Sequence, residues 1–434
     1  MRKNTRSRAA RIDRAQNAAI LLLSLSALLL LLQTPLFGGF SVKKAALSLK
    51  NRFFAVQESG KPAELPRASL CFPLRMVLTN ELVRCGADAL TTADEDFETV
   101  GAYLGEAVGS AHDAFPVRES VFLAALEKPG IYFDFTTAIP LELFAESLGV
   151  AAPDVEPASV RRALLLPSGS SGAELYLQDG QGQSYRLSTA VSSAALDGYL
   201  ASLVGNGVDL LGASDEWGGV LSPYTMIPEQ PSRVRLTAAD AVPDWEELLR
   251  RAGFNPHTES YYTDSSGTLV VREGGSTLSL RTDGTALYQG GAAAPDSAYV
   301  IAAAQDGSPT LSEALSAAQR LILALLGDGS GDAALYLSGV QTSENGCTFT
   351  ADYMIGGTPL RFSDGEHAAV VVTEGGSIVS CSLRFRRYGK TDETVQLLPF
   401  AQAAAIAQGR PDAELAVLYA DYGGESVSPC WAVN

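Results

Sequence analysis

A long apolar run near the N-terminus limits what this chain can be. Residues 18–32 read Ala-Ala-Ile-Leu-Leu-Leu-Ser-Leu-Ser-Ala-Leu-Leu-Leu-Leu-Leu, and the apolar character extends to Phe40 with two polar interruptions. About 20 such residues in a helix cross roughly 30 Å of hydrocarbon. Six basic side chains and one acid precede the run, a net charge of +5 that is typical of a cytoplasmic flank. The sequence therefore predicts a single-pass protein of the cell membrane, with a cytoplasmic basic stub at 1–16, a transmembrane helix at 17–40 and an extracytoplasmic remainder.

A cleaved export signal is the alternative, because it has the same order of basic and apolar residues. The end of the apolar run distinguishes the two. Residues 36–41, Leu-Phe-Gly-Gly-Phe-Ser, contain no A-x-A pattern, and the bulky Phe40 lies between the small residues Gly39 and Ser41. No cysteine lies near this exit to carry a lipid. An uncleaved anchor is therefore favoured over a cleaved signal.

The part of the chain after the stub is large and acidic. The 434 residues carry a net charge of −17, so a stub of +5 leaves −22 for the remainder. Such a charge repels nucleic acid and anionic lipid, which excludes nucleic-acid functions. With 46% hydrophobic residues the chain can bury substantial cores, and one core seldom serves this many residues. Two or three exterior domains are expected.

Composition and periodicity divide this remainder into four segments. A juxtamembrane segment at 41–65 precedes an N-terminal α/β domain at 66–153, with a helix expected from Glu95 to Ala111. Three strand candidates and a helix predict a central meander-plus-helix domain at 154–230, which ends in a proline-rich stretch. Residues 231–434 repeat one helix followed by alternating strands with Gly-Gly and Asp-Gly turns. The predicted fold class is α+β, built from antiparallel β-meander plus helix units.

Catalytic and metal-binding signatures are missing from the sequence. The three histidines, His112, His257 and His367, show no H-E-x-x-H spacing. Residues 169–172, Gly-Ser-Ser-Gly, lack the G-x-S-x-G spacing, and 328–332, Asp-Gly-Ser-Gly-Asp, are not followed by the glutamate that closes a calcium loop. We therefore expect no catalytic residues, no cofactor and no metal, and we expect that the protein is not an enzyme.

The five cysteines form an odd set without a C-x-x-C motif, which argues against a disulfide scaffold. Cys347 and Cys381 lie in two predicted strands, so a bridge between them is one alternative. The other is that both are small buried residues of strands.

Seven residues are candidates for contact with a partner. Two aromatic pairs can line a groove for a partner or a peptide, although aromatics at strand edges are usually core. Helix association in lipid uses small and hydroxyl side chains, and three occur together in the apolar run. The candidate residues are Ser24, Ser26, Ala27, Tyr132, Phe133, Tyr261 and Tyr262.

Several stretches together resemble the YycH/YycI family of Gram-positive bacteria. Residues 130–141, Gly-Ile-Tyr-Phe-Asp-Phe-Thr-Thr-Ala-Ile-Pro-Leu, resemble a mid-chain segment of such proteins. Residues 253–284, with Gly-Phe-Asn-Pro, Tyr-Tyr and two hairpin turns, look like the start of the family's repeated β-rich domain. The ending, residues 428–433, Ser-Pro-Cys-Trp-Ala-Val, resembles the terminal Pro-x-Trp strand of YycI-like and PepSY-like domains.

The resemblance implies a function in signalling. These family members are single-pass proteins that regulate an essential cell-wall sensor histidine kinase of a two-component system, without catalytic residues of their own. Their partners are that kinase and a sister regulatory protein in the membrane. Two alternatives remain open: a PepSY-like extracytoplasmic binding or protease-inhibitor module, and a cell-envelope hydrolase with dispersed acidic residues.

Overall fold

The described residues belong to one compact unit, Pro66–Asn434. The computed structural model describes residues 71–169, 172–211, 221–228, 232–258, 261–290, 299–301, 309–407 and 413–433. Within these ranges no helix has the length and apolar composition that a membrane crossing requires. The stub, transmembrane helix and juxtamembrane segment predicted at 1–16, 17–40 and 41–65 lie outside the described residues.

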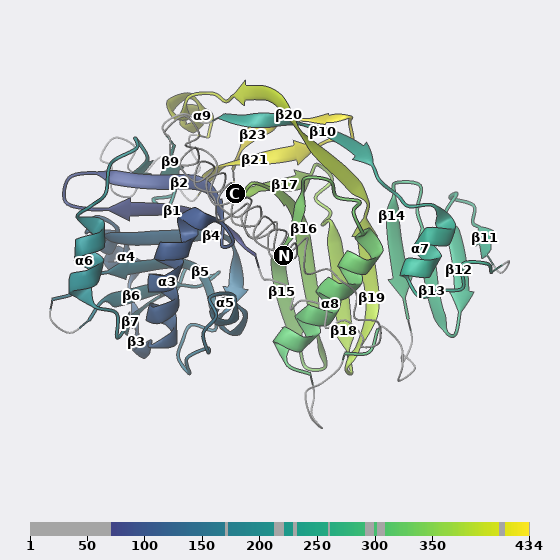
Figure 1. Cartoon of the computed structure of the whole chain (residues 1–434), viewed down its shortest axis with the longest axis horizontal. Helices are drawn as coiled ribbons and strands as arrows, with labels where there is room; N and C mark the ends of the chain where they lie inside the picture. Colours follow the sequence, from purple (N-terminus) through teal and green to yellow (C-terminus); the bar gives the residue numbers. More distant parts are fainter. Residues whose placement is uncertain are drawn as a thin grey trace, which may run out of the picture. The chain divides into compact units, whose positions relative to one another are not determined.

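The first half of the unit is a seven-stranded antiparallel sheet with the order β2-β1-β4-β5-β6-β7-β3 (Figure 1). Its strands are β1 (Pro73–Thr79), β2 (Arg84–Thr91), β3 (His112–Val117), β4 (Gly130–Pro140), β5 (Ser159–Leu166), β6 (Glu174–Gln178) and β7 (Ser184–Ser188). Its helices are α3 (Glu95–Gly109), α4 (Glu119–Leu126), α5 (Leu141–Ser147) and α6 (Ser193–Leu200). A short ribbon follows, β8 (Asp209–Leu210) with β9 (Met226–Ile227).

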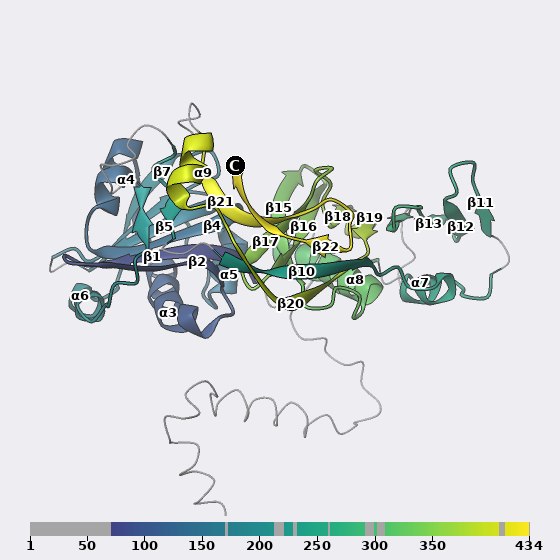
Figure 2. The same ribbon diagram turned by 90° about the horizontal axis from the view of Figure 1, so that it is seen from above.

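Helices cover both faces of this sheet, and its central strands β1 and β4 are buried on both sides. Alternate residues of β4 enter two different cores: Ile131 and Phe133 pack with α3 and α5, whereas Tyr132 packs with Phe122 of α4. Figure 2 shows α4 on one side of the sheet and α3 and α6 on the other. The sheet is therefore a central layer and not an exposed surface.

The two blocks that the sequence separates at 153/154 share this sheet. Strand β4, before the boundary, pairs with β5, after it, from Ile131↔Leu165 to Pro140↔Ser159. Helix α5 and a short loop connect the two strands. A Pro- and Ala-rich connection thus links neighbours within one sheet, and the segments 66–153 and 154–188 fold together.

The second half is an eleven-stranded sheet with the order β11-β12-β13-β14-β19-β18-β16-β17-β21-β23, and β15 pairs with β16. Its strands are β11 (Tyr261–Thr263), β12 (Leu269–Glu273), β13 (Ser276–Leu280), β14 (Thr285–Gln289), β15 (Ala334–Ser343), β16 (Gly346–Ile355), β17 (Thr358–Phe362), β18 (Ala369–Glu374), β19 (Ser377–Arg384), β21 (Leu415–Asp421) and β23 (Pro429–Val433). Only β17 and β21 pair in parallel among these described strands. The mixed α+β class with mostly antiparallel meanders is confirmed.

A three-stranded sheet and three helices complete this half. The sheet has the order β20-β10-β22, with β10 (Ser232–Asp240), β20 (Arg386–Gln396) and β22 (Ser426–Val427). The helices are α7 (Trp245–Arg251), α8 (Leu311–Leu326) and α9 (Phe400–Ile406). All five cysteines are free thiols, so Cys347 and Cys381 are not bridged.

Helix α8 illustrates how local sequence fixes these elements. Thr310 accepts a hydrogen bond from the backbone of Glu313, and the Glu313 side chain accepts one from Thr310, which forms a capping box. Apolar residues three and four apart, such as Leu315, Ala318 and Ile322, form its buried face. Sequence periodicity predicts this helix at Ser312–Leu326, within one residue of the structure.

Candidate functional site

The most unusual feature of the seven-stranded sheet is a charged residue in the middle of its apolar strand β4. The flanking residues Phe133 and Phe135 are fully buried in the larger core. Asp134 between them points to the opposite side, as Tyr132 does, and only 1% of it is exposed. An ionised carboxylate in such a place needs charged or hydrogen-bonding partners, because burial without them is costly.

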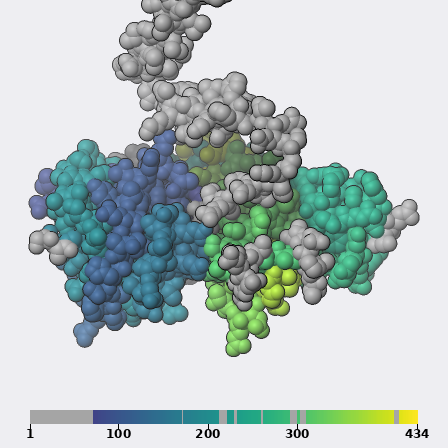
Figure 3. All heavy atoms as spheres, turned by 60° about the horizontal axis from the view of Figure 1, so that its bottom comes forward, coloured from purple at the N-terminus to yellow at the C-terminus, as the bar shows by residue number. Residues whose placement is uncertain are grey.

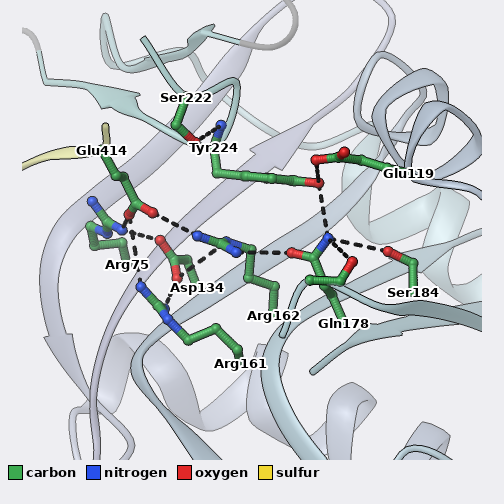
Figure 4. A network of polar contacts seen from close by, with 11 residues as sticks. Arg75, Glu119, Asp134, Arg161, Arg162, Gln178, Ser184, Ser222, Tyr224 and Glu414 are labelled. Carbon is green, nitrogen blue, oxygen red and sulfur yellow. Dashed lines mark hydrogen bonds and ion pairs between the residues drawn. The ribbon is translucent and has the colours of Figure 1, made fainter. Parts of the chain in front are cut away.

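Strand register supplies these partners as a row that crosses the sheet. Asp134 lies opposite Arg75 of β1 and opposite Arg162 of β5. Arg162 in turn lies opposite Gln178 of β6, which lies opposite Ser184 of β7. Residues directly opposite each other in antiparallel strands share a face, so five polar side chains form one line (Figure 4).

Three guanidinium groups surround the carboxylate of Asp134. Arg75 and Arg161 each form an ion pair with it, and Nε of Arg162 lies 3.7 Å from its Oδ1. Burial alone would raise the pKa of Asp134, but the charges of Arg161, Arg75 and Arg162 outweigh burial and lower it. Asp134 is therefore ionised at neutral pH.

Glu414 completes the arrangement from the other half of the molecule. It directly precedes β21, is 5% exposed and forms an ion pair with Arg75. Its Oε2 lies 2.6 Å from Nη2 of Arg162, and its Oε1 lies 3.8 Å from Nη2 of Arg161. We call Arg75, Asp134, Arg161, Arg162 and Glu414 the charge cluster. Its three arginines and two acids leave one positive charge in excess.

Neutral groups extend the charge cluster toward α4. Nε2 of Gln178 donates a hydrogen bond to the Tyr224 hydroxyl at 2.9 Å, and that hydroxyl donates to Oε1 of Glu119 at 3.1 Å (Figure 4). The guanidinium of Arg162 stacks over the Tyr224 ring, 4.2 Å from its centroid. Burial, with Glu119 beside it, raises the pKa of Tyr224 to about 12. Tyr224 therefore stays protonated and serves as a fixed donor.

The chemistry of the charge cluster favours a structural role over a catalytic one. A general base must exchange a proton near the working pH, whereas the arginines hold Asp134 ionised far below it. Within the described ranges, no group of three or more His, Cys, Asp and Glu residues could hold a metal ion. The charge cluster joins β1, β4 and β5 of the seven-stranded sheet to the start of β21 of the eleven-stranded sheet.

Other contacts join the seven-stranded sheet to the second half of the unit. Arg233 of β10 forms an ion pair with Asp88 of β2 at 2.8 Å. The turn between β16 and β17 also approaches β2 closely, because a Cβ on Gly357 would meet the backbone nitrogen of Leu90 at 2.5 Å. Only a glycine fits a backbone approach of this kind.

The predicted partner-contact residues divide into three groups. Ser24, Ser26 and Ala27 lie outside the described residues. Tyr132 and Phe133 are 4% and 0% exposed, so the expectation that they contact a partner is corrected: both are core residues.

The second aromatic pair differs from the first. Tyr261 and Tyr262 are 50% and 47% exposed on β11, the strand at one end of the order of the eleven-stranded sheet. Their role as partner contacts stays a prediction. Trp245 of α7 supports the pair from inside, with its ring 6.4 Å from that of Tyr261.

The sequence reasoning missed the charge cluster, although a signal was present. Four of its residues are single or paired charges within or next to apolar strand runs: Arg75, Asp134, Arg161 and Arg162. A charged residue within an apolar strand indicates a buried ion pair, because charged side chains are almost never fully buried unless they are paired.

Comparisons with known proteins place this architecture. No protein-family model matches the sequence, and no curated protein matches it. Among solved structures, the crystal structure of YycH from Bacillus subtilis matches with a TM-score of 0.52 at 11% identity, over 85% of this chain and 95% of that chain. This chain has the fold of YycH. The resemblance to the YycH/YycI family is thus confirmed at the level of the fold.

A second solved structure gives no further information. The dehydratase domain of MlnD from Bacillus amyloliquefaciens aligns with 72% of this chain and 88% of that chain at 11% identity. Its TM-score of 0.11 is far too low to carry an argument about fold or activity.

Proposed function

We propose that this chain is a membrane-anchored extracytoplasmic regulator of a two-component sensor histidine kinase, which acts through protein–protein contacts. The observation that carries the proposal is the YycH fold over 85% of the chain. The basic stub and apolar run at residues 1–40 support it, because they are the sequence pattern of a single-pass anchor. The charge cluster, whose acids and arginines are paired with one another, is consistent with a protein whose buried ionisable groups have a structural role.

The exposed aromatic pair on β11 is the contact surface that we propose for the exterior part. β11 pairs only with β12 among the described strands, so its outer edge can pair with a strand of a partner. Its two tyrosines can contact an aromatic-binding surface of that partner. Tyrosine is enriched in protein interfaces because it combines apolar area with a polar tip. In Figure 1 the strands β11–β13 lie at the end of this unit remote from the seven-stranded sheet, and in Figure 3 the teal spheres of this part of the chain lie at the same end. The partners proposed are the kinase's exterior domain and a sister regulatory protein.

A photo-crosslinking experiment tests this surface. A photoreactive phenylalanine analogue replaces Tyr262 in the full chain in its native membrane, and the crosslinked product is identified by mass spectrometry. Tyr422 is the matched control position, since it is also a tyrosine and is 82% exposed, but it follows β21. We expect a histidine kinase or a membrane-anchored sister protein at position 262 and not at position 422. The same products at both positions, or neither partner at position 262, contradict the proposed surface.

Replacing the apolar run tests the anchor separately. Exchange of residues 17–40 for an unrelated apolar helix should leave the exterior part folded but change autophosphorylation of the kinase, because small and hydroxyl residues such as Ser24, Ser26 and Ala27 are lost from the bilayer contact. Unchanged autophosphorylation of the kinase after this exchange, with no kinase recovered by crosslinking, would contradict the proposed function.

A further inference from the structure

A polar pocket lies where the two sheets meet, between β4 and the strands β15 to β17. It has a volume of about 300 Å³. Pockets that bind small molecules have volumes from about 300 Å³ upward and often lie where two structural units meet. Its polar lining comes from both sheets and includes Thr136, Tyr336, Asp352, Arg361, Glu366 and His367.

An irregularity in β4 presents one side of this pocket. The pairing of β4 with β5 jumps from Asp134↔Arg162 to Ile139↔Val160, so the residues between make no regular ladder with β5. Thr137, in this stretch, donates a hydrogen bond from Oγ1 to the carbonyl oxygen of Ser338 on β15 at 2.6 Å. Irregularities of this kind redirect side chains and are over-represented next to functional sites. The irregularity in β4 places Thr136 and Thr137 against the eleven-stranded sheet.

The two threonines differ in what their hydroxyl groups do. Oγ1 of Thr137 is used in the contact with β15, whereas the buried hydroxyl of Thr136 interacts with the hydroxyl of Tyr336. A hydroxyl group has one donor site and two acceptor sites, so this interaction leaves the Thr136 hydroxyl able to bind a ligand atom in the pocket as well.

The pocket also brings together charges of both signs. Asp352 of β16 is buried and accepts hydrogen bonds from Nδ1 of His367 at 2.9 Å and from the backbone nitrogen of Ala368 at 3.1 Å. Arg361 of β17 and Glu366 lie at the rim and are exposed. A simple anion in this space would face two carboxylates, and a simple cation would face a guanidinium. A molecule with both charges fits the lining.

We propose that this pocket binds a small zwitterion of the size of a free amino acid or a dipeptide. The carboxylate of the ligand is held by Arg361 and by the hydroxyl of Thr136, and its ammonium group by Asp352 and Glu366. Guanidinium–carboxylate pairs and charge-assisted hydrogen bonds supply the strongest polar contacts available to such a ligand. The site goes beyond the proposed regulatory function and does not depend on it.

The pocket adjoins the charge cluster. A second cavity of about 30 Å³ shares Thr136 and Arg361 with it and is also lined by Arg75 and Arg161. A ligand in the pocket therefore lies next to the ion pairs that join the two sheets. Occupancy should raise the stability of the junction, because a ligand that binds only the folded state stabilises it.

Calorimetry and thermal unfolding of the full chain test the proposal. The probes are free amino acids, Ala-Ala, N-acetyl-Ala-Ala, which lacks the ammonium group, and Ala-Ala amide, which lacks the carboxylate. We expect saturable binding of at least one free amino acid or of Ala-Ala, and at least tenfold weaker binding of both blocked peptides. Absence of binding for every unblocked probe at millimolar concentration overturns the proposal. So does equal binding of blocked and unblocked peptides.

Substitutions locate the binding site. Arg361→Gln should weaken binding at least tenfold, whereas Arg272→Gln, on the exposed face of β12, should not. Thr136→Val keeps the shape of the side chain and removes its hydroxyl, so it should weaken binding of the ligand. Thr137→Val should lower that stability, because it removes the hydrogen bond to Ser338. Binding that survives both Arg361→Gln and Thr136→Val lies elsewhere and contradicts the assignment.

Discussion

Nη2 of Arg162 lies 2.6 Å from Oε2 of Glu414, a residue 252 positions further along the chain. This ion pair ties the middle of the seven-stranded sheet to the start of β21. It is buried, and Glu414 is one of only two acids facing three arginines in the charge cluster. The charge cluster already has one positive charge in excess, so the loss of either acid would leave its three arginines with only one carboxylate in the cluster to balance them. The stability of the junction should therefore depend on them strongly.

Glu414→Gln should be severely destabilising. The amide keeps the size of the side chain but leaves three buried guanidinium groups with one carboxylate, and breaking a buried pair costs about 3–5 kcal/mol. Denaturant unfolding measures this loss. The matched control is Glu393→Gln, because Glu393 pairs with Arg235 at 3.3 Å while 59% of its side chain is exposed. An exposed pair contributes at most about 1 kcal/mol. Equal losses in the two variants would contradict a dependence on the charge cluster.

The stability of the protein should fall in acid. The pKa of Asp134 and that of Asp421 are both lowered in the folded protein, although burial opposes this: three arginines lower the first, and Arg386 together with hydrogen bonds from Gly423 and Tyr388 lowers the second. A carboxyl group whose pKa is lower in the folded state stabilises the protein above its unfolded pKa of about 3.9, and this contribution is lost as pH falls through the lower folded value. Chemical unfolding at pH 7, 5, 4 and 3 should show the decline from these groups below about pH 4.

Asp421→Asn provides the control for this pH dependence. Asp421 accepts hydrogen bonds from Nε and Nη2 of Arg386 at 2.9 and 3.2 Å. The variant should be less stable than the native chain at pH 7 but should lose less stability between pH 5 and pH 3, because one of the titrating groups is gone. A decline as steep as that of the native chain would show that Asp421 is not one of its sources.

The turn between β16 and β17 offers a test of how closely the two sheets approach. Gly356 and Gly357 both have positive φ, 53° and 74°, so alanine strains the backbone at either position. Only at Gly357 would the added Cβ meet the backbone of Leu90, whereas at Gly356 nothing lies within 4 Å. Gly357→Ala should lower the melting temperature clearly more than Gly356→Ala does. Equal melting temperatures would mean that the approach to β2 is not tight in solution.

Local sequence predicts the helices well and the pairing of strands poorly. The helix expected at Glu95–Ala111 is found at Glu95–Gly109, because residues three and four apart, such as Val100 and Leu104, define one apolar face within a single segment. The pairing of β4 with β5 depends instead on two segments separated by α5, and the predicted boundary at 153/154 missed it. Register depends on the hydrophobic patterns of both strands together and on the connection between them, and not on the pattern of either strand alone.

The site was less accessible to sequence reasoning than the fold. That Asp134 needs a partner can be read from its place between Phe133 and Phe135, since an isolated charge in an apolar strand is seldom left unpaired. Which partners it has cannot be read, because Arg75 comes from 59 residues before it and Glu414 joins only through the second sheet. The error on Tyr132 has the same origin: both faces of β4 are covered, which a single strand's pattern does not reveal.

Two neighbouring tyrosines in the second half of the unit allow a hydrogen bond to a charged acceptor to be compared with a hydrogen bond to a neutral acceptor. The hydroxyl of Tyr388 donates to Oδ2 of Asp421 at 2.8 Å, and that of Tyr353 donates to the carbonyl oxygen of Arg384 at 2.9 Å. Both residues are 0% exposed, and their ring centroids are 5.4 Å apart. Because hydrogen bonds to charged groups contribute about 1.5–3 kcal/mol and neutral ones about 1 kcal/mol, Tyr388→Phe should lower the free energy of unfolding more than Tyr353→Phe.

Tyr388→Phe should also move the acid-induced loss of stability to higher pH, because Asp421 loses a donor that favours its ionised form. Denaturant titrations of both variants at pH 7 and pH 4 measure the two effects, and a larger loss for Tyr353→Phe at both pH values would assign the stabilisation to ring packing instead of to the carboxylate.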